Sequence, residues 1–503
     1  MTRVSAHPAG PPGQAGTAPL PVIPDQAGAA AGTAPLPAVP DVVIRNGPVE
    51  WVMSRVIRKL AWSRLSDPKV ALTLSGAGLL LGMIVGATAP NAETIPLQLP
   101  LSHLLPSLGH SETNVVIASI LLYTGNILAC LGLAGMLWAH SQGWRPNPKH
   151  LLWASAAIIA VMVSLTPVGS SDTGSYAAYG RIAALGGNPY TTGPAAFLGA
   201  HSSYTQAVGT LWKTQPSVYG PFATVIQSFA ASIGGPNVSV TVWALMILNG
   251  AVFIGVGWLL LKTSDDPVRA TLFWTANPVL IQQLVSGGHL DTLVAAAAIC
   301  AIQVARRVSG VWGDVVIGVL IGLACGIKIN AVLIALGLAW PLLRRHEWMR
   351  TTRIALVALA TVALQYWPYG LVALRPIFGG LKLATLPSPW RVFELIGAAF
   401  GGPVAEHSVA TAMGYRWPVA MLIVAWFVYQ RISSDQPGEV VAPFALTYAW
   451  ILVAPWVFAW YTGIAWVALT QVPRNRMTRW LTLVTVFLAL CHSSGGQATP
   501  GIR

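Results

Sequence analysis

Long apolar runs follow one another through most of this 503-residue chain, separated by short polar segments. A helix needs about 20 apolar residues to cross a bilayer, and many of these runs come close to that length. Charged residues make up only 9% of the sequence, against about 25% in an ordinary soluble domain. So few charges cannot cover a soluble fold of this size, and disorder would require low hydrophobicity. The chain is therefore predicted to be an all-α polytopic membrane protein.

The apolar runs predict a bundle of about 11–13 transmembrane helices with long extracytoplasmic loops. A shorter run at residues 221–234 is expected to form a re-entrant or interfacial helix. The candidate spans are residues 70–89, 115–139, 151–168, 238–261, 268–286, 290–305, 313–327, 329–343, 354–374, 417–430, 441–458, 460–472 and 480–494.

The segments outside the spans predict the remaining organisation. Residues 1–44 are rich in Pro, Gly and Ala and bury too little apolar area to offset the entropy of ordering, which predicts a disordered cytoplasmic tail. Residues 45–69 are basic with apolar residues at helical spacing, which predicts an amphipathic juxtamembrane helix on anionic lipid; a basic linker is the alternative. The first apolar run starts near Val70, too late for a secretory signal peptide. The membrane domain covers residues 70–494, and a short tail, 495–503, follows.

The basic residues predict the orientation of the chain in the membrane. With the N-terminus in the cytoplasm, 21 of the 29 Lys and Arg residues fall inside and 8 outside, as the positive-inside rule requires. The net charge of +13 therefore sets orientation and does not indicate a nucleic-acid partner. The same topology predicts two long outer segments, about residues 169–237 and 375–416. Loops of this length are usually functional, so we expect a site on the extracytoplasmic face of the plasma membrane.

The first outer segment holds Asp172 directly after the third predicted span. A carboxylate at the membrane surface costs far less than the roughly 2.5–3.5 kcal/mol of the bilayer centre, so it can stay ionised and act as a base. Asp is equally a favoured N-cap, and a helical run with Tyr176 and Arg181 follows. The turn Asn188-Pro189-Tyr190 ends this run and presents Tyr190, and Tyr219 lies in a similar Gly/Pro turn.

Two polar residues open a later span at the same predicted face. Gly287-Gly288 interrupt the apolar pattern, and His289 and Asp291 follow. Asp291 suits a helix start, where it complements the helix dipole, and it suits substrate binding equally. One His and one Asp are too few for a metal site, so no metal is predicted.

Lys328 lies between two apolar spans with no acidic residue near it in the sequence. An ionised Lys at that depth needs a partner. A lipid phosphate is one candidate, and snorkelling to the lipid head groups is the other. Together with Arg375, Lys382 and Arg391 of the second outer segment, Lys328 would form an electropositive mouth for a lipid phosphate.

Aromatic residues, Trp456 and Tyr461 among them, cluster at the predicted outer ends of spans. Most aromatic residues at such depths form the interfacial belt, and a few can stack on sugar rings. All the candidate residues fall on one predicted face. Proton- or ion-coupled carriers usually hold ionisable residues near the midplane, so this distribution favours an enzyme over a transporter.

Several motifs follow one another in a distinctive order: Asp172…Tyr176…Gly180-Arg181…Gly187-Asn188-Pro189-Tyr190, Val218-Tyr219-Gly220-Pro221, Gly287-Gly288-His289-Leu290-Asp291, Lys328, Pro455-Trp456 and Trp460-Tyr461. This order resembles the GT-C superfamily of glycosyltransferases that use polyprenyl-phosphate sugars. The closest similarity is to the polyprenol-phosphomannose-dependent α-(1→6)-mannosyltransferases of the actinobacterial envelope. In one departure, Thr173-Gly174 follow Asp172 where the family often has Asp-Val-Tyr or two adjacent acids. This bears on the identity of the sugar more than on the reaction class.

The resemblance implies a GT-C-like fold and an inverting transfer of mannose from polyprenyl-phosphate-mannose to an α-(1→6)-linked mannan or lipoglycan acceptor. Asp172 would be the general base, and Lys328 with Arg375 or Arg391 would hold the donor phosphate. No cofactor is implied, although a single cation at Asp172 stays open. The implied partners are the lipid-linked donor, a glycan or glycolipid acceptor and membrane lipid. The substrate-binding residues would be Tyr176, Arg181, Asn188, Tyr190, Tyr219, His289, Asp291, Trp456 and Tyr461.

Three alternative functions are compatible with the same sequence. A flippase or transporter of lipid-linked sugars would show internal repeats and polar residues in mid-helix. A GT-C enzyme could use arabinose or glucose instead of mannose. A non-catalytic scaffold would bind polyprenyl phosphate without transferring a sugar.

Overall fold

The computed structural model describes residues 67–88, 95, 97–102, 104–106, 112–380, 384–432 and 436–491. Every regular element within these ranges is a helix, which confirms the predicted all-α polytopic membrane protein. The predicted tails at 1–44 and 495–503, nearly all of the juxtamembrane segment, and Lys382 lie outside the described residues.

Most of the predicted spans correspond to helices of the structure. Three helices within the described ranges are long and apolar enough to cross a bilayer: Pro68–Thr88, Thr113–Ser141 and Val238–Thr263. A further pair, Trp348–Tyr366 with Leu371–Ile377, is bent, and several other apolar helices have only 10–17 residues, so a total of about 11–13 spans stays a prediction. The helices that match predicted spans are α2 (Pro68–Thr88), α3 (Glu112–Ser141), α4 (Pro148–Met162), α9 (Val238–Thr263), α12 (Asp291–Arg307), α13 (Val311–Ile327), α14 (Val332–Arg344), α18 (Gly438–Val453), α19 (Thr462–Leu469) and α20 (Met477–Cys491).

Three predicted spans differ from the structure. The run at 268–286 is broken into three pieces, α10 (Pro267–Phe273), α11 (Pro278–Leu280) and a π-helix (Ile281–Ser286), because a proline cannot continue the hydrogen bonding of the preceding helix. The run at 354–374 is α15 (Trp348–Tyr366) followed by Leu371–Ile377, which turns away by 103°. The run at 417–430 is the end of a longer helix, α17 (Pro389–Arg431), which is kinked at Gly402.

The run at 221–234 is α8 (Pro221–Gly234). Its Val225, Phe229 and Ile233 are exposed, and these positions, four residues apart, share one face of the helix. Its other face packs against α5 (Asp172–Ala184) and α9. An exposed apolar face on a short helix is what the predicted interfacial helix requires.

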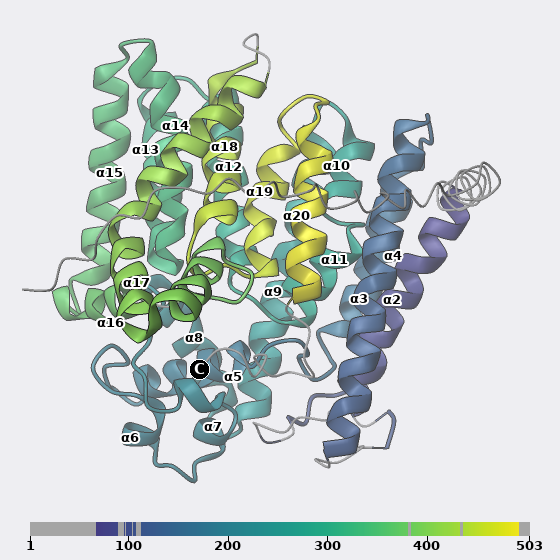
Figure 1. Ribbon diagram of the computed structural model, residues 1–503, viewed down its shortest axis with the longest axis vertical. Coiled ribbons are helices and arrows are strands. Elements are labelled where there is room, and N and C mark those ends of the chain that lie inside the picture. Colours follow the sequence, from purple (N-terminus) through teal and green to yellow (C-terminus); the bar gives the residue numbers. More distant parts are fainter. Residues whose placement is uncertain are drawn as a thin grey trace, which may run out of the picture. The chain divides into compact units, whose positions relative to one another are not determined.

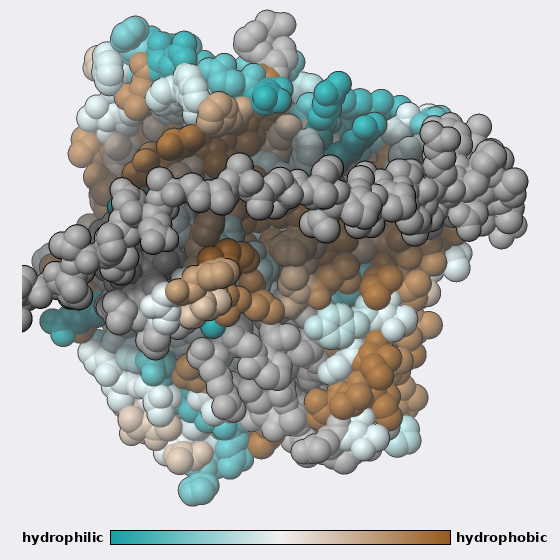
Figure 2. Space-filling model, in the orientation of Figure 1, coloured by the Kyte–Doolittle hydropathy of each residue, from teal (hydrophilic) through white to brown (hydrophobic). Residues whose placement is uncertain are grey.

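The connections between the described helices lie at two opposite ends of the helices (Figure 1). One end carries α5, α6 (Pro194–Leu198), α7 (Ser203–Gln206) and α8, and we call it the α5 end. The other end, the arginine-rich end, joins α9 to α10, α14 to α15 and α19 to α20. Hydrophilic residues gather at the arginine-rich end, and hydrophobic residues predominate across the middle (Figure 2). Exposed apolar side chains of the long helices, such as Leu80 of α2 and Leu422 of α17, suit contact with lipid.

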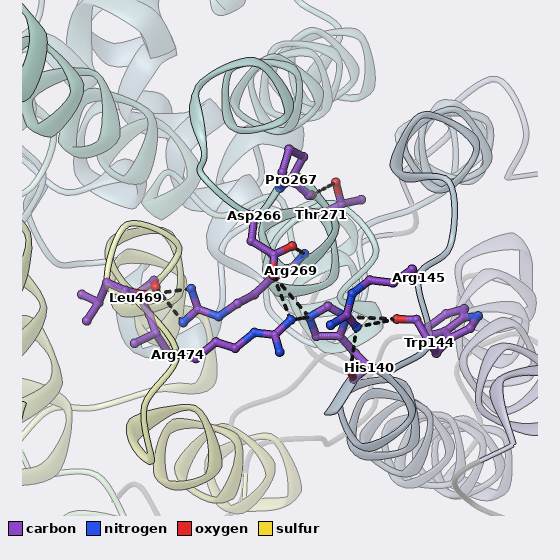
Figure 3. A network of polar contacts seen from close by, with 10 residues as sticks. His140, Trp144, Arg145, Asp266, Pro267, Arg269, Thr271, Leu469 and Arg474 are labelled. Carbon is purple, nitrogen blue, oxygen red and sulfur yellow. Dashed lines mark hydrogen bonds and ion pairs between the residues drawn. The ribbon is translucent and has the colours of Figure 1, made fainter. Parts of the chain in front are cut away.

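Ion pairs tie the helix ends together at the arginine-rich end (Figure 3). Asp266 accepts a hydrogen bond from Arg474 at 3.1 Å and lies 3.6 Å from His140. Arg269 donates to the carbonyl oxygens of Leu469 and Val472 at 3.2 and 2.8 Å. These contacts link α3, α10 and the connection between α19 and α20. They explain how the basic residues that sequence analysis places inside come to share one end.

Candidate active site

Asp172 is the first residue of α5, and Ser171, not Asp172, occupies the N-cap position. The N-cap interpretation of Asp172 is therefore wrong. One carboxylate oxygen, Oδ2, accepts a hydrogen bond from the Tyr176 hydroxyl at 3.3 Å and lies 3.3 Å from Nδ1 of His289. No donor within the described part of the chain reaches the other oxygen, Oδ1. The side chain is 23% exposed, so Oδ1 can accept a proton from an incoming group.

The π-helix and the two glycines after it bring His289 to Asp172. Gly288 has a φ of +65°, which favours glycine, and a Cβ at this position would lie 2.3 Å from the Thr173 side chain. No larger residue fits where this turn meets α5. His289 is buried and its ring stacks on Trp460, with centroids 3.8 Å apart. Its carbonyl accepts a hydrogen bond from Asn249 of α9 at 2.6 Å.

Asp291 and Lys328 form a buried ion pair, although they lie 37 residues apart in the sequence. The Lys328 ammonium donates to both carboxylate oxygens, at 3.0 and 2.9 Å. It also lies over the ring of Tyr461, 3.9 Å from the centroid. Lys328 therefore has an acidic partner, and the snorkelling interpretation is wrong. Of its three N–H groups, two are used by Asp291, and the side chain keeps 16% exposure.

Aromatic rings surround these two carboxylates. Tyr219 packs edge-on against Tyr176, with centroids 4.9 Å apart. The backbone N–H of Gly220 donates to Ile327 at 3.0 Å, which holds the Tyr219 turn beside Lys328. On the other side, Tyr461 stacks on Trp450 at 4.9 Å. Hydrophobic, planar walls with a few fixed polar groups are typical of sites that bind sugars and other small ligands.

The segment before Trp460 is itself anchored by residues that directly precede α17. Thr385 Oγ1 donates to the Val457 carbonyl at 3.0 Å, and Ser388 Oγ donates to that of Ala454 at 3.1 Å. Trp456 packs edge-on against Phe458, which stacks on Trp460 at 4.5 Å. Trp456 is thus connected to the site through Phe458 and lies one ring away from Trp460.

Five predicted site residues make contacts outside this group. Arg181 lies over the Tyr204 ring at 5.8 Å, and Asn188 accepts the backbone N–H of Tyr190 at 2.9 Å. The Tyr190 hydroxyl is 2.6 Å from that of Thr224. Arg391 pairs with Glu394 at 2.9 Å, and Arg375 is exposed at the start of α16 (Arg375–Gly380). The predicted binding roles of these residues stay predictions, and for Asn188 and Tyr190 the contacts fit a role in shaping the loop.

The surroundings of Asp172 keep it ionised. Burial raises the pKa of the Asp172 carboxyl, but His289, Lys328 and Tyr176 together lower it by more, so its pKa lies below its ordinary value. Burial raises the pKa of Tyr176 and of Tyr219 well above the ordinary value, so both hydroxyls stay protonated and can donate. Within the described residues, no three His, Cys, Asp or Glu side chains gather closely enough to hold a metal ion.

Sequence reasoning missed Asn249, and it named Trp460 as an outer aromatic and in the Trp460-Tyr461 motif but not among the site residues. Asn249 accepts a hydrogen bond from Thr292 at 3.2 Å as well as donating to His289, so it joins α9 to the start of α12. The available signal was an amide in the middle of an apolar span, where an unsatisfied polar group is costly. Such a residue calls for a partner on a neighbouring helix.

Comparison with known families identifies the chain. The family model described as alpha-(1->6)-mannopyranosyltransferase, N-terminal domain, matches residues 73–344. The chain belongs to this family. The match contains Asp172, His289, Asp291 and Lys328. It confirms the resemblance to the actinobacterial α-(1→6)-mannosyltransferases.

Individual relatives agree with the family match. A probable alpha-(1->6)-mannopyranosyltransferase of Mycolicibacterium smegmatis is 28% identical over 55% of this chain and 44% of its own length. Alpha-(1->6)-mannopyranosyltransferase A of Mycobacterium tuberculosis is 26% identical over 70% of this chain and 71% of that protein. Alpha-(1->6)-mannopyranosyltransferase B of Corynebacterium glutamicum is 22% identical over 80% and 72%. The chain thus spans less than half of the first relative's length. No solved structure matches it.

Proposed function

We propose that this chain is an inverting membrane mannosyltransferase. It moves a mannosyl residue from polyprenyl-phosphate-mannose to an α-(1→6)-linked mannan or lipoglycan acceptor at the outer face of the plasma membrane. Family membership and the names of the relatives support the reaction class. The observation that carries the mechanism is the arrangement of Asp172, whose Oδ2 is oriented by two side chains while Oδ1 stays available.

Asp172 acts as the general base in this proposal. The acceptor hydroxyl gives its proton to Oδ1 as its oxygen attacks the anomeric carbon of the donor. The bond between that carbon and the phosphate oxygen breaks, and the electron pair leaves with polyprenyl phosphate. One displacement turns a β-linked donor into an α-linked product. Help from a positioned base is typically worth about 10²–10⁴ in rate.

Tyr176 and His289 position the base. The tyrosine O–H donates to Oδ2, and the stacked, buried imidazole of His289 lies 3.3 Å from the same oxygen. Because the pKa of Asp172 lies below its ordinary value, the base is ready at neutral pH. A geometry fixed before the substrate arrives lowers the cost of reaching the reactive arrangement.

Lys328 supports the leaving phosphate as a hydrogen-bond donor. Asp291 neutralises its charge and the ammonium also contacts Tyr461, so Lys328 contributes a hydrogen bond and little net positive charge. Arg375 is an exposed cation that can supply that charge, and Arg391 would have to share its guanidinium with Glu394. Groups that stabilise charge as it develops on a leaving group accelerate the reaction directly. Tyr219, Tyr461 and Trp456 are the surfaces on which we place the sugar rings.

The basic end of the structure supports the proposed orientation. The residues that the positive-inside rule assigns to the cytoplasm include Arg269 and Arg474, which meet near Asp266. Asp172 begins a helix of the other end (Figure 1). With the arginine-rich end in the cytoplasm, the site opens on the extracytoplasmic side, where lipid-linked sugars would be used.

The deciding experiment is a transfer assay. Membranes containing wild type or Asp172→Asn are given radiolabelled polyprenyl-phosphate-mannose and an α-(1→6)-mannan acceptor, with arabinosyl and glucosyl donors run beside it. Asp172→Asn is expected to lower mannosyl transfer about 10²–10⁴-fold at equal protein level. Asp265→Asn is the control, because that side chain is 81% exposed at the arginine-rich end. Unchanged transfer by Asp172→Asn would remove this residue from the mechanism.

A further inference from the structure

A buried amide beside the proposed base has no use in the mechanism above. Gln282 belongs to the π-helix Ile281–Ser286 and is only 5% exposed. Its Oε1 is fully enclosed and has no hydrogen-bond partner among the described residues. Buried polar groups in folded proteins are nearly always satisfied, and short π-helical turns occur frequently at functional sites. The amide therefore calls for a ligand.

Gln282 lines a small cleft that reaches the site. Asn126 of α3, Gln283 and His289 also line this cleft, together with Gly169 from the connection before α5. Two amides from the π-helix, a third from α3 and an imidazole are groups suited to hydrogen-bonding. Among the described residues that line it there is no Lys, Arg, Asp or Glu, so the cleft suits a neutral hydroxyl group better than a phosphate.

The dimensions of the cleft limit what can enter. Its free space is enough for roughly one water molecule, which is also the size of one hydroxyl group of a larger molecule. Glycines keep α2 and α3 close together beside Gln282: a Cβ added to Gly78 of α2 would lie 2.6 Å from the carbonyl oxygen of Gly125 of α3. The cleft shares His289 with the site, and the imidazole lies 3.3 Å from Asp172.

We propose that this cleft is a subsite for one hydroxyl group of a sugar substrate and that Gln282 is a specificity-determining residue. The proposal rests on the proposed mannosyltransferase function and names a part of the sugar that the site recognises. The hydroxyl donates to Oε1 of Gln282, which satisfies that atom only when substrate is bound. The sugar can be that of the donor or that of the acceptor, since both approach Asp172.

The test combines Gln282→Leu with substrates that each lack one hydroxyl. The kcat/KM of wild type and of Gln282→Leu is measured with mannosyl donor, with singly deoxygenated donors and with singly deoxygenated acceptors. With complete substrates, Gln282→Leu is expected to lower kcat/KM about 10–100-fold, the range for losing one hydrogen bond in a buried site. With the substrate that lacks the recognised hydroxyl, Gln282→Leu should lower kcat/KM no further, because the two changes remove the same interaction.

The results separate the two sources of the hydroxyl. Non-additivity with a deoxy donor assigns the subsite to the donor, and non-additivity with a deoxy acceptor assigns it to the acceptor; both support the proposal. If the effects add for every position of both substrates, or if Gln282→Leu equals wild type, the cleft holds only water and the proposal is overturned. If wild type transfers no mannose at all, it is the proposed function that fails.

Two controls separate recognition from folding. Gln303→Leu removes another buried glutamine, which bonds Thr263 and Gln471 at the arginine-rich end, and it should leave the discrimination among deoxy substrates unchanged. Gln282→Glu keeps the shape and an acceptor oxygen but loses the amide donor, and it should retain more activity than Gln282→Leu. Thermal unfolding in detergent is recorded for all variants. If Gln282→Leu does not fold, the deoxy series is measured with Gln282→Met, which also lacks Oε1, and additivity at every position again overturns the proposal.

Discussion

Asp314, at the arginine-rich end, and Asp172, at the α5 end, both lie in the first turn of a helix. Different numbers of donors reach them. Arg350 donates to Oδ1 of Asp314 at 2.7 Å, and Arg353 donates to Oδ2 at 2.7 Å, so both oxygens are occupied and the side chain is buried. Asp172 is contacted at Oδ2 alone and remains partly exposed. A carboxylate with both oxygens engaged holds helices together, whereas one with a free oxygen can take part in chemistry.

The Asp291–Lys328 pair is intermediate between Asp314 and Asp172 in its contacts and its exposure. Both oxygens of Asp291 are bound by Lys328, as both oxygens of Asp314 are bound by arginines. Lys328 itself lies against the ring of Tyr461 and keeps some exposure. Both oxygens of Asp291 are thus engaged, and Lys328 is the partly exposed member of the pair.

The largest expected contrast comes from making the same substitution at both ends. Asp172→Asn should lower transfer about 10²–10⁴-fold and leave the unfolding temperature nearly unchanged. Asp314→Asn should lower the stability, because removing the charge leaves two arginines without their shared partner, and it should not change kcat per folded molecule. Activity and thermal unfolding in detergent measure the two effects. Equal effects of both variants on stability and kcat would contradict the division between the ends.

The next effect concerns the Asp291–Lys328 pair. Lys328→Met leaves the fully buried carboxylate of Asp291 without its partner, and breaking such a pair costs about 3–5 kcal/mol. Arg350→Met should cost less, because Arg353 still holds Asp314. The double variant Lys328→Met/Asp291→Asn should regain much of the lost stability but not the affinity for donor. Chemical or thermal unfolding and donor binding are measured together, and full recovery of donor binding in the double variant would remove Lys328 from the phosphate site.

A smaller effect is expected in the pH dependence. His289 contributes to keeping the pKa of Asp172 below its ordinary value. Without the imidazole this pKa rises, so in His289→Gln the acid limb of kcat/KM should move to higher pH while the rate at neutral pH falls about 10-fold. His150→Gln, an exposed histidine of the arginine-rich end, should leave the profile unchanged. An acid limb that stays in place in His289→Gln would show that the imidazole does not act on Asp172.

The sequence predicts the regular helices better than their interruptions. Apolar runs such as those of α2, α3 and α9 are long enough to define a span without knowledge of the neighbours. The break at Asn277-Pro278 and the π-helix after it produce no lasting loss of hydrophobicity, so the run at 268–286 looks continuous. The same π-helix holds Gln282 in the lining of the cleft and leads to the turn that brings His289 to Asp172, and this is why the cleft could not be found from the sequence.

The members of the site could be predicted more readily than their pairing. Asp172, His289, Asp291 and Lys328 are recognisable as polar residues at the edges of apolar runs. That Lys328 needs a partner follows from the cost of burying a charge. That Asp291 is the partner depends on how α12 packs against α13, which no local pattern encodes. Arg391 pairs with Glu394, and phosphate binding by Arg375 and Arg391 stays a prediction.

The smallest expected effect tests whether an exposed cation adds to phosphate binding. Arg375 is exposed, and a charge in water contributes only about 0.2–1 kcal/mol, so Arg375→Ala should raise the donor KM about 1.4- to 5-fold. The increase should shrink with added salt, which screens exposed charges. Arg391→Ala should do less, because Glu394 already engages that guanidinium, and Arg431→Ala at the arginine-rich end should do nothing. If the donor KM of Arg375→Ala matches that of wild type at low salt, Arg375 does not bind the phosphate. Phosphate recognition in the described part of the site would then depend on Lys328, whose charge Asp291 already neutralises.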